Sequence, residues 1–257
     1  MEMDHYEHGI PSWVDLGTPD PTAAAAFYGG LFGWESFEGP PEAGGYRMEL
    51  LRGRTVAGIG PAMNPGPPYW TTYVTVDDAD AIVPLVAEAG GAVLAEPFDV
   101  LDVGRMAVFA DPQGAAFSVW QARSHPGAGL VNEPGAYCWS ELVTSDVEAA
   151  KAFYGKVFGW GARVSDGSGG SYTEWQVSDR SVGGLMARPP GMPAMVPDHW
   201  GVYFAIADHD DAVAKVTALG GSVMMGPMTV AVGTFSVCVD PQGASFNVLQ
   251  LSGARAG

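Results

Sequence analysis

One stretch of the chain occurs twice, and its first copy, residues 13–34, reads WVDLGTPDPTAAAAFYGGLFGW. Residues 139–160 read WSELVTSDVEAAKAFYGKVFGW, which is identical at 13 of the 22 positions without a gap. Each copy starts with alternating apolar and polar residues, as a strand does, and continues into an alanine-rich run with helical spacing. Asp20 or Thr22 is placed to cap the first helix, and the glycines between 29 and 33 are placed to end it.

The repeat continues through the rest of the chain with small changes of offset. Residues 69–81 correspond to residues 199–211 at an offset of 130. Residues 111–121, DPQGAAFSVWQ, correspond to residues 240–250, DPQGASFNVLQ, at an offset of 129. A repeat of this length is typical of two homologous domains and not of a short-period solenoid.

Glycine and proline gather between the two copies, in HPGAGLVNEPG at residues 125–135. This run lacks hydrophobic periodicity and predicts a linker, so we expect domains at 1–124 and 136–257. Within each domain a strand and a helix are followed by about three short strands, and the pattern then starts again. We therefore expect four βαβββ modules, two in each domain.

Composition excludes several classes of function. The formal net charge is −17, with only 12 lysines and arginines in 257 residues, and such a chain repels nucleic acid and anionic membrane surfaces. Cys138 and Cys238 show no spacing of a thiolate zinc site. The N-terminal residues do not resemble a signal peptide, and no apolar run reaches 18 residues. We expect a soluble cytoplasmic protein, either a monomer whose domains pair or a homodimer.

Strand alternation predicts a ligand-sized hollow. Successive side chains of a strand face opposite sides of a sheet, so Val14 and Leu16 share one face of the opening strand while Trp13 and Asp15 share the other. Later strands repeat the contrast between an aliphatic face, suited to packing under helices, and a face that mixes aromatic, small and polar residues. A mixed face of this kind suits a concave binding cavity better than a dry core.

The helix pattern D-x3-A-x2-FY-x3-FG and the DPQG turn, each present twice and in order, resemble the vicinal oxygen chelate superfamily. That superfamily includes glyoxalase I, bleomycin-resistance proteins and extradiol dioxygenases. The double-domain layout is similar to actinobacterial proteins described as glyoxalase-like or as hydroxylases. The resemblance implies an α+β fold with two tandem glyoxalase-like domains, each built of paired βαβββ modules whose mixed sheet curls into a cup.

The resemblance also implies where relatives would bind a metal ion, and this chain departs from the pattern at every such place. Imidazole nitrogens or anionic oxygens must replace the water that a transition metal loses on binding. Neither an imidazole nor a carboxylate stands at the eight corresponding positions, so we expect no metal site and no cofactor. These positions are Trp13, Gly58, Thr71 and Ser118 in the first domain and Trp139, Gly184, Gly201 and Asn247 in the second.

Two carboxylates are the candidate catalytic groups. Asp15 and Glu141 occupy equivalent positions, two residues after Trp13 and Trp139, and face the same side as those indoles. Burial between aromatic walls disfavours the charged form and would allow either carboxylate to act as a general base. The alternative is that each carboxylate pairs with an arginine or a backbone amide and only orders the cup.

The tryptophans give the clearest indication of a ligand. Indole offers a broad flat surface and one hydrogen-bond donor, which suits stacking against a planar apolar molecule. A histidine beside a strand end could add a polar contact. The candidate ligand-binding residues are Trp13, Trp70, Tyr73, Ser118 and Trp120 from the first domain and Trp139, His199, Trp200, Tyr203 and Asn247 from the second.

Three functions are compatible with these observations. The first is metal-independent binding of a small hydrophobic or aromatic molecule, for drug sequestration and resistance or as an accessory to secondary metabolism. The second is a glyoxalase-like lyase or a hydroxylase-type enzyme that uses Asp15 or Glu141 as its base. The third is an interaction protein whose cups are filled by their own side chains, in which case no cavity of about 300 Å³ or more would exist.

Overall fold

The computed structural model describes residues 1–63, 66–167, 170–193 and 195–253. Four helices and sixteen strands occur in these residues, in the order of four βαβββ modules, as the sequence predicts. In the first domain the elements are β1 (Pro11–Thr18), α1 (Pro21–Phe32), β2 (Glu35–Glu38), a 3-10 turn (Pro41–Ala43), β3 (Arg47–Leu51), β4 (Arg54–Pro61), β5 (Tyr69–Thr75), α2 (Ala79–Glu88), β6 (Ala92–Val100), β7 (Gly104–Ala110) and β8 (Ala116–Ala122).

The second domain repeats the same series. Its elements are β9 (Tyr137–Thr144), α3 (Val147–Phe158), β10 (Gly161–Gly167), β11 (Gly170–Val177), β12 (Arg180–Ala187), β13 (His199–Ala205), α4 (His209–Ala218), β14 (Ser222–Val230), β15 (Gly233–Val239) and β16 (Ser245–Leu251).

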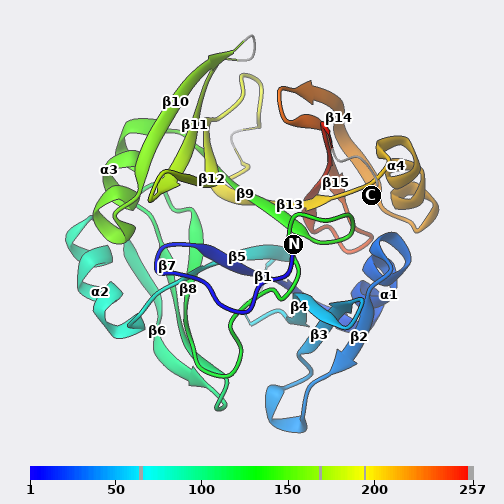
Figure 1. The fold of residues 1–257 in the computed structure, drawn as a ribbon, viewed down its shortest axis with the longest axis horizontal. Helices are drawn as coiled ribbons and strands as arrows, with labels where there is room; N and C mark the ends of the chain where they lie inside the picture. Colours follow the sequence, from blue (N-terminus) through cyan, green and yellow to red (C-terminus); the bar gives the residue numbers. More distant parts are fainter. Residues whose placement is uncertain (64–65, 168–169, 194, 254–257) are drawn as a thin grey trace.

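Each domain forms one mixed sheet of eight strands. The order is β2-β3-β4-β1-β5-β8-β7-β6 in the first sheet and β10-β11-β12-β9-β13-β16-β15-β14 in the second. Within a module the first strand pairs in parallel with the last, and the two modules join through the antiparallel pairs β1–β5 and β9–β13. Both sheets are curled (Figure 1), which confirms the predicted paired modules.

The repeated helices begin and end as their sequences predict. The Asp20 side chain accepts a hydrogen bond from the Ala23 amide, 3.0 Å away, so Asp20 and not Thr22 caps α1. Gly33 ends the helix with a φ of 77°, a left-handed conformation that glycine adopts without steric cost. Asp146 and Gly159 play the same parts in α3.

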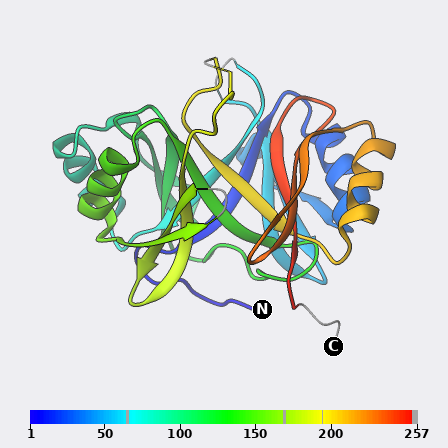
Figure 2. The same cartoon turned by 90° about the horizontal axis from the view of Figure 1, so that it is seen from above.

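The helices pair across the two domains. Helix α1 contacts α4, and α2 contacts α3, so one helix pair lies on each flank of the molecule (Figures 1 and 2). Aromatic rings fill the interface between the domains; the centroids of Phe32 and Phe204, for example, are 5.1 Å apart. Between the flanks the sheets meet directly, where the hydroxyl oxygens of Thr72 and Ser140 are 2.8 Å apart.

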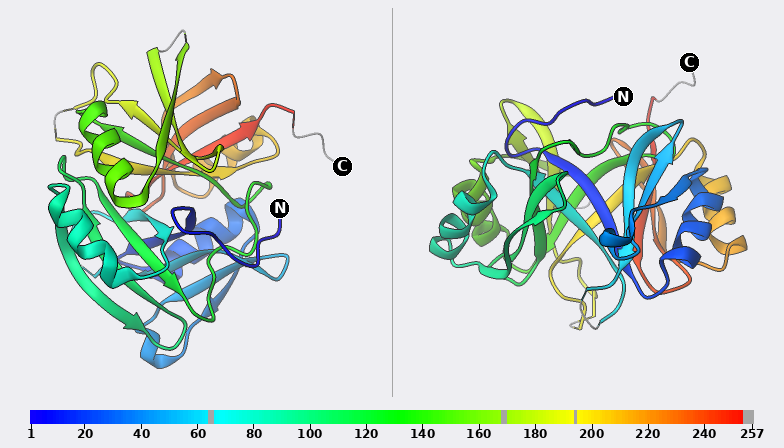
Figure 3. Two further views of the ribbon diagram at one scale, coloured as in Figure 1. Left: turned by 60° about the vertical axis from the view of Figure 1, so that its left-hand side comes forward. Right: turned by 90° about the horizontal axis from the view of Figure 1, so that it is seen from below.

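The N-terminal tail and the segment between the domains lie against each other. The Met3 amide donates to the Gly129 carbonyl (3.1 Å), and the Tyr6 hydroxyl donates to the Ala128 carbonyl (2.6 Å). The two segments run together along the first domain (Figure 3). Residues 127–131 are buried, so the predicted linker is a packed part of the structure.

Candidate functional site

The inner faces of the two curled sheets carry the predicted carboxylates. In the first domain Trp13 of β1 pairs with Tyr73 of β5, and Tyr73 pairs with Ser118 of β8. We call the face of the first sheet that carries Trp13, Asp15 and Tyr73 cup 1. Val14 and Leu16, between them in sequence, are fully buried on the opposite face, as the strand alternation predicts. We call the corresponding face of the second sheet, with Trp139, Glu141 and Tyr203, cup 2.

Asp15 is bound by two tyrosines in cup 1. The hydroxyl of Tyr73 donates to Asp15 Oδ2 at 2.8 Å, and the hydroxyl of Tyr46 donates to the same oxygen at 3.2 Å. The indole N–H of Trp13 donates to the Tyr46 hydroxyl at 3.1 Å. The side chains therefore form a chain of hydrogen bonds from indole to phenol to carboxylate.

Glu141 has the same surroundings in cup 2. Tyr172 donates to Oε2 at 2.7 Å and Tyr203 donates to Oε1 at 2.8 Å. The indole N–H of Trp139 donates to the Tyr172 hydroxyl at 3.0 Å. In both cups the carboxylate partners are phenols, in place of the arginine or backbone amide that the sequence analysis considered.

Burial controls the protonation of both carboxylates. Removal from water raises the pKa of Asp15 from 3.8 to about 6, although the hydrogen bonds from Tyr73 and Tyr46 act in the opposite direction. Burial likewise raises the pKa of Glu141, against the effect of its two tyrosines. Asp15 keeps some solvent exposure, whereas Glu141 is buried. A carboxylate with a pKa near 6 is suited to accept a proton near neutral pH.

The tyrosines occupy the space beside two of the expected metal-ligand positions. Gly58 pairs with Asp15 and Gly184 pairs with Glu141 in the parallel strands. A Cβ atom on Gly58 would overlap the Tyr46 hydroxyl, and a Cβ on Gly184 would overlap the Tyr172 hydroxyl. Glycine at these positions therefore makes room for a phenol beside each carboxylate.

These residues do not fit a divalent metal of the kind that relatives bind. Each cup offers one carboxylate, which already accepts hydrogen bonds from two tyrosines. Within the described part of the chain, no three histidine, cysteine, aspartate or glutamate side chains are grouped so that they could hold an ion. A single carboxylate among phenols and an indole lacks the ligand set that a transition metal requires.

Tyr46 and Tyr172 are site residues that the sequence analysis missed. Both lie 12 positions before the glycine that accommodates them, and both follow the repeat offset of 126. Alignment of the two halves could have found this conserved spacing within the chain. It could not have shown that the phenol points at the carboxylate, because that contact depends on how β3 and β11 are positioned beside β4 and β12.

The other predicted residues of the inner faces have less uniform surroundings. Ser118 is buried, and among the described residues its hydroxyl has no hydrogen-bond partner. Asn247 is buried at the equivalent place and donates to the Val202 carbonyl at 3.1 Å. Trp120 is buried, and its indole N–H donates to the His125 carbonyl at 2.8 Å.

Trp70 and Trp200, two of the predicted ligand-binding residues, lie on the opposite face of their strands from the cup residues. Each lies one strand position away from the inner-face residues, so alternation along β5 and β13 turns its indole to the opposite face of the sheet. Trp70 donates to the Tyr28 hydroxyl at 3.0 Å, and Trp200 donates to the Tyr154 hydroxyl at 2.9 Å. Both indoles belong to the core between the domains.

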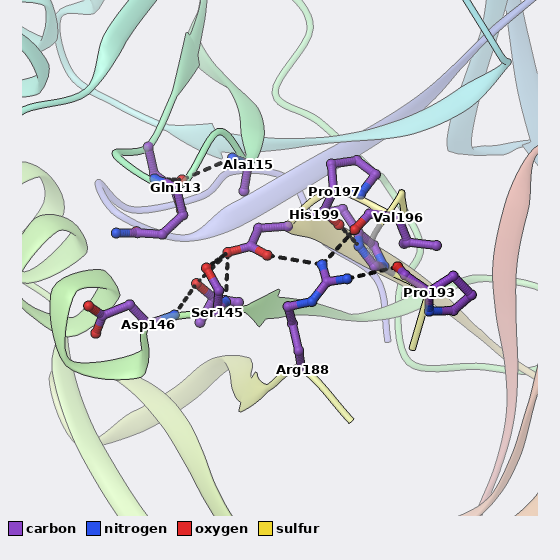
Figure 4. Close-up of polar contacts among 12 residues, drawn as sticks. Gln113, Ala115, Ser145, Asp146, Arg188, Pro193, Val196, Pro197 and His199 are labelled. Carbon is purple, nitrogen blue, oxygen red and sulfur yellow. Dashed lines mark hydrogen bonds and ion pairs between the residues drawn. The ribbon is translucent and has the colours of Figure 1, made fainter. Parts of the chain in front are cut away.

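His199 lies at the start of β13 and is kept there by a local contact. Its Nδ1 is 2.9 Å from the Pro197 carbonyl (Figure 4). Nearby, the Arg188 guanidinium forms an ion pair with Asp198 at 3.2 Å. It also donates to the carbonyls of Pro193 and Val196, in the loop that leads into β13. Burial raises the pKa of Asp198, but hydrogen bonds from Ser145, Thr144 and Arg188 outweigh it and lower the pKa overall.

Comparison with known proteins agrees with this architecture. The model of the Glyoxalase/Bleomycin resistance protein/Dioxygenase superfamily matches residues 4–119 and 136–248. The chain is 46% identical over 258 residues to "Putative glyoxylase CFP32" of Mycobacterium tuberculosis, with 97% of each chain covered. It is 39% identical over 265 residues to "Anthracycline biosynthesis protein DnrV" of Streptomyces peucetius, with 97% of this chain and 96% of the relative covered.

Solved structures share the fold at low sequence identity. The Mn(II)-bound glyoxalase from Novosphingobium aromaticivorans superposes with a TM-score of 0.64 at 19% identity, covering 96% of this chain and 84% of the other. The 2,2',3-trihydroxybiphenyl 1,2-dioxygenase from Sphingomonas wittichii gives 0.65 at 15% identity, covering 96% and 93%. In the described residues no helix has both the length and the apolar character needed to cross a bilayer. With both halves matched by one family model, the chain belongs to the Glyoxalase/Bleomycin resistance protein/Dioxygenase superfamily, as two tandem domains.

Proposed function

We propose that this protein binds a planar, aromatic or hydrophobic small molecule without a metal ion. The observation that carries the proposal is the repeated arrangement of an indole, two phenols and one carboxylate on the inner face of each sheet. Aromatic walls offer flat apolar surface, and a few convergent polar groups fix the orientation of a ligand. We retain 1–124 and 136–257 as the domain boundaries and 125–135 as the linker.

The polar groups at the centre of each cup favour a ligand that carries hydroxyl or keto groups. The Glu141 carboxylate is an acceptor, while the hydroxyls of Tyr172 and Tyr203 can donate to a ligand oxygen if they turn away from Glu141. The relatives named for anthracycline biosynthesis support the same ligand class, because anthracyclines carry flat, hydroxylated ring systems. A role beside secondary metabolism or in sequestration of such a compound follows from this chemistry.

Isothermal titration calorimetry with daunorubicin, an anthracycline, tests the proposal. We expect saturable binding by protein purified without chelator, and the same affinity after treatment with EDTA. Elemental analysis of the untreated protein should find transition metal far below one ion per chain. Glu42→Gln, a change in an exposed turn, should bind daunorubicin as the wild type does and is the control for substitutions in the cups. Absence of binding, or binding that disappears with EDTA and returns with Mn²⁺, Ni²⁺, Zn²⁺ or Fe²⁺, would contradict the proposal.

The pKa of Asp15 favours a second candidate, an enzyme that uses this carboxylate as a general base. A group with a pKa of about 6 is partly deprotonated near neutral pH and can accept a proton from a bound carbon acid. The hemithioacetal formed from methylglyoxal and a thiol is the appropriate first substrate for a glyoxalase-like reaction. Turnover that falls by about 100-fold or more in Asp15→Asn or Glu141→Gln would support this activity, and turnover unchanged in both would exclude these bases.

A further inference from the structure

The two cups differ in one respect that the sequence repeat conceals: a ring from the chain itself lies inside cup 1. We propose that His125 fills the ring-binding slot of cup 1 as an internal plug, and that the external ligand binds only in cup 2. This inference rests on the proposed function for its ligand, but the plug itself is a separate claim about the protein.

The plug is defined by contacts with two indoles. The His125 ring meets Trp13 edge-to-face, with 4.6 Å between centroids and 86° between planes, and meets Trp120 at 5.7 Å and 69°. Backbone hydrogen bonds hold the residue in place. The Trp120 N–H donates to the His125 carbonyl at 2.8 Å, and the His125 amide donates to the Val103 carbonyl at 3.1 Å.

The imidazole is bound as an apolar ring, not as a polar group. Its Nε2 atom is buried and has no hydrogen-bond partner among the described residues. Burial lowers the pKa of His125 from 6.5 to about 4, so the ring is neutral at physiological pH. An aromatic ring with an unpaired polar atom therefore occupies the place that a planar ligand would take between Trp13 and Trp120.

The second domain has no aromatic residue at either of the two equivalent sequence positions. At the offset of 129, Trp120 corresponds to Leu249 and His125 corresponds to Ala254. Ala254 lies outside the described residues, but an alanine side chain contains no ring that could serve as a plug. The second domain thus repeats the carboxylate and its tyrosines but not the histidine ring.

The accessibility of the tryptophans follows this difference. Trp13 is only 4% exposed beneath the plug, whereas its counterpart Trp139 is half-buried. The other six tryptophans are all buried, so Trp139 is the one of the eight that is not fully buried. Phe235 of β15 is also half-buried and packs against Tyr203 at 5.7 Å. Trp139 and Phe235 are therefore the partly exposed aromatic residues against which we expect the external ring to pack.

The plug also indicates how the ligand is oriented. If cup 2 binds a ring as cup 1 binds His125, the ring meets Trp139 edge-to-face, close to the Tyr172 and Glu141 hydrogen-bond chain. A hydroxyl on that ring is then placed to donate to Glu141 or to accept from Tyr172. The ligand class is a flat ring system with a hydroxyl or keto group at one edge.

The plug is tested first without any ligand, by acrylamide quenching of tryptophan fluorescence. We expect the quenching constant of His125→Ala to exceed that of the wild type by on the order of twofold, because two buried indoles become accessible. His125→Phe, which keeps a ring in the slot, and Ser124→Ala, an exposed neighbour, should both match the wild type. Circular dichroism confirms that the variants are folded. Equal quenching of His125→Ala and His125→Phe would overturn the plug.

The choice of cup is tested by calorimetry with daunorubicin. We expect one molecule bound per chain for the wild type and for His125→Phe, and two for His125→Ala. Glu141→Gln should weaken daunorubicin binding by about tenfold relative to the wild type, because a carboxylate hydrogen-bond acceptor is lost. Two sites in the wild type, or an affinity unchanged by Glu141→Gln, would overturn the assignment to cup 2. Absence of binding in every variant would count against the proposed function alone, and the quenching result would still decide the plug.

Discussion

Tyr28 in the first domain donates a hydrogen bond to Asp240 in the second, with 3.1 Å between the hydroxyl oxygen and Oδ2. In the equivalent pair of the repeat, the Tyr154 hydroxyl donates to Asp111 Oδ2, also at 3.1 Å. These residues come from the two motifs that mark the family, the FY pair of the helix and the DPQG turn. The tyrosine of each helix motif thus donates to the aspartate of the DPQG turn in the other domain. The residues that define the repeat are therefore also residues that connect the two domains.

Tyr28→Phe should lower the free energy of unfolding by about 1–3 kcal/mol, because a buried acceptor on Asp240 and the N–H of Trp70 would lose their partner. Urea unfolding followed by circular dichroism measures the change. Tyr69→Phe is the matched control, since that tyrosine is 46% exposed. Equal stability of the two variants would show that the bond across the domains contributes nothing.

Gly58→Ala and Gly184→Ala should each destabilise the protein by about 1–3 kcal/mol, because the added methyl group would displace Tyr46 or Tyr172 from its carboxylate. Gly66→Ala provides the control, since a Cβ there meets no other atom within 4 Å. Thermal unfolding compares the three variants. A Gly58→Ala protein as stable as Gly66→Ala would contradict the assigned packing of Tyr46 against Gly58.

Asp15 should make stability decrease as pH rises from about 4 to about 6. Its pKa is 3.8 ordinarily and about 6 in the folded protein, so the folded state binds more protons than the unfolded state in this range. Each pKa unit corresponds to about 1.4 kcal/mol. Urea unfolding at pH 4.5 and pH 7 measures the free energy of unfolding at each pH. The part of the difference that comes from Asp15 should be present in the wild type and absent in Asp15→Asn. An unchanged difference between the two pH values would contradict the raised pKa.

His125 should make the protein less stable as the pH falls, which is the opposite of the effect of Asp15, over an overlapping pH range. Because burial lowers its pKa from 6.5 to about 4, the folded state binds fewer protons than the unfolded state, and stability is lost as pH falls through this interval. His125→Phe should remove the loss, so the variant should tolerate pH 5 better than the wild type does. NMR titration of the His125 ring measures the pKa directly, and a midpoint near 6.5 would contradict its burial.

Much of the fold follows from local features of the sequence. Alternation in β1 correctly separates Val14 and Leu16 from Trp13 and Asp15, because side-chain direction in a strand depends only on position. The same rule already applied to Trp70 and Trp200, which stand next to the inner-face positions 71 and 201. Alternation therefore places both indoles on the face opposite the cups, in the core between the domains.

The contacts of the candidate site were harder to predict. Tyr46 lies outside the regular strands, and it reaches Asp15 only because β3 and β4 bring it over Gly58. His125 belongs to a Gly/Pro-rich segment without periodicity, so nothing in its local sequence indicates burial between two indoles. Both contacts join residues that are distant along the chain, and such pairings depend on how whole strands and loops are packed.

The four modules, their order and the faces of the strands could be predicted from the sequence, because the repeat and the local hydrophobic pattern indicate them. The phenols around each carboxylate, the joining of the two domains by the family motifs and the ring of the chain itself in cup 1 became visible only in the folded structure. Those features arise when side chains far apart in sequence compete for the same enclosed space, and a repeat alone does not specify which of them occupies it.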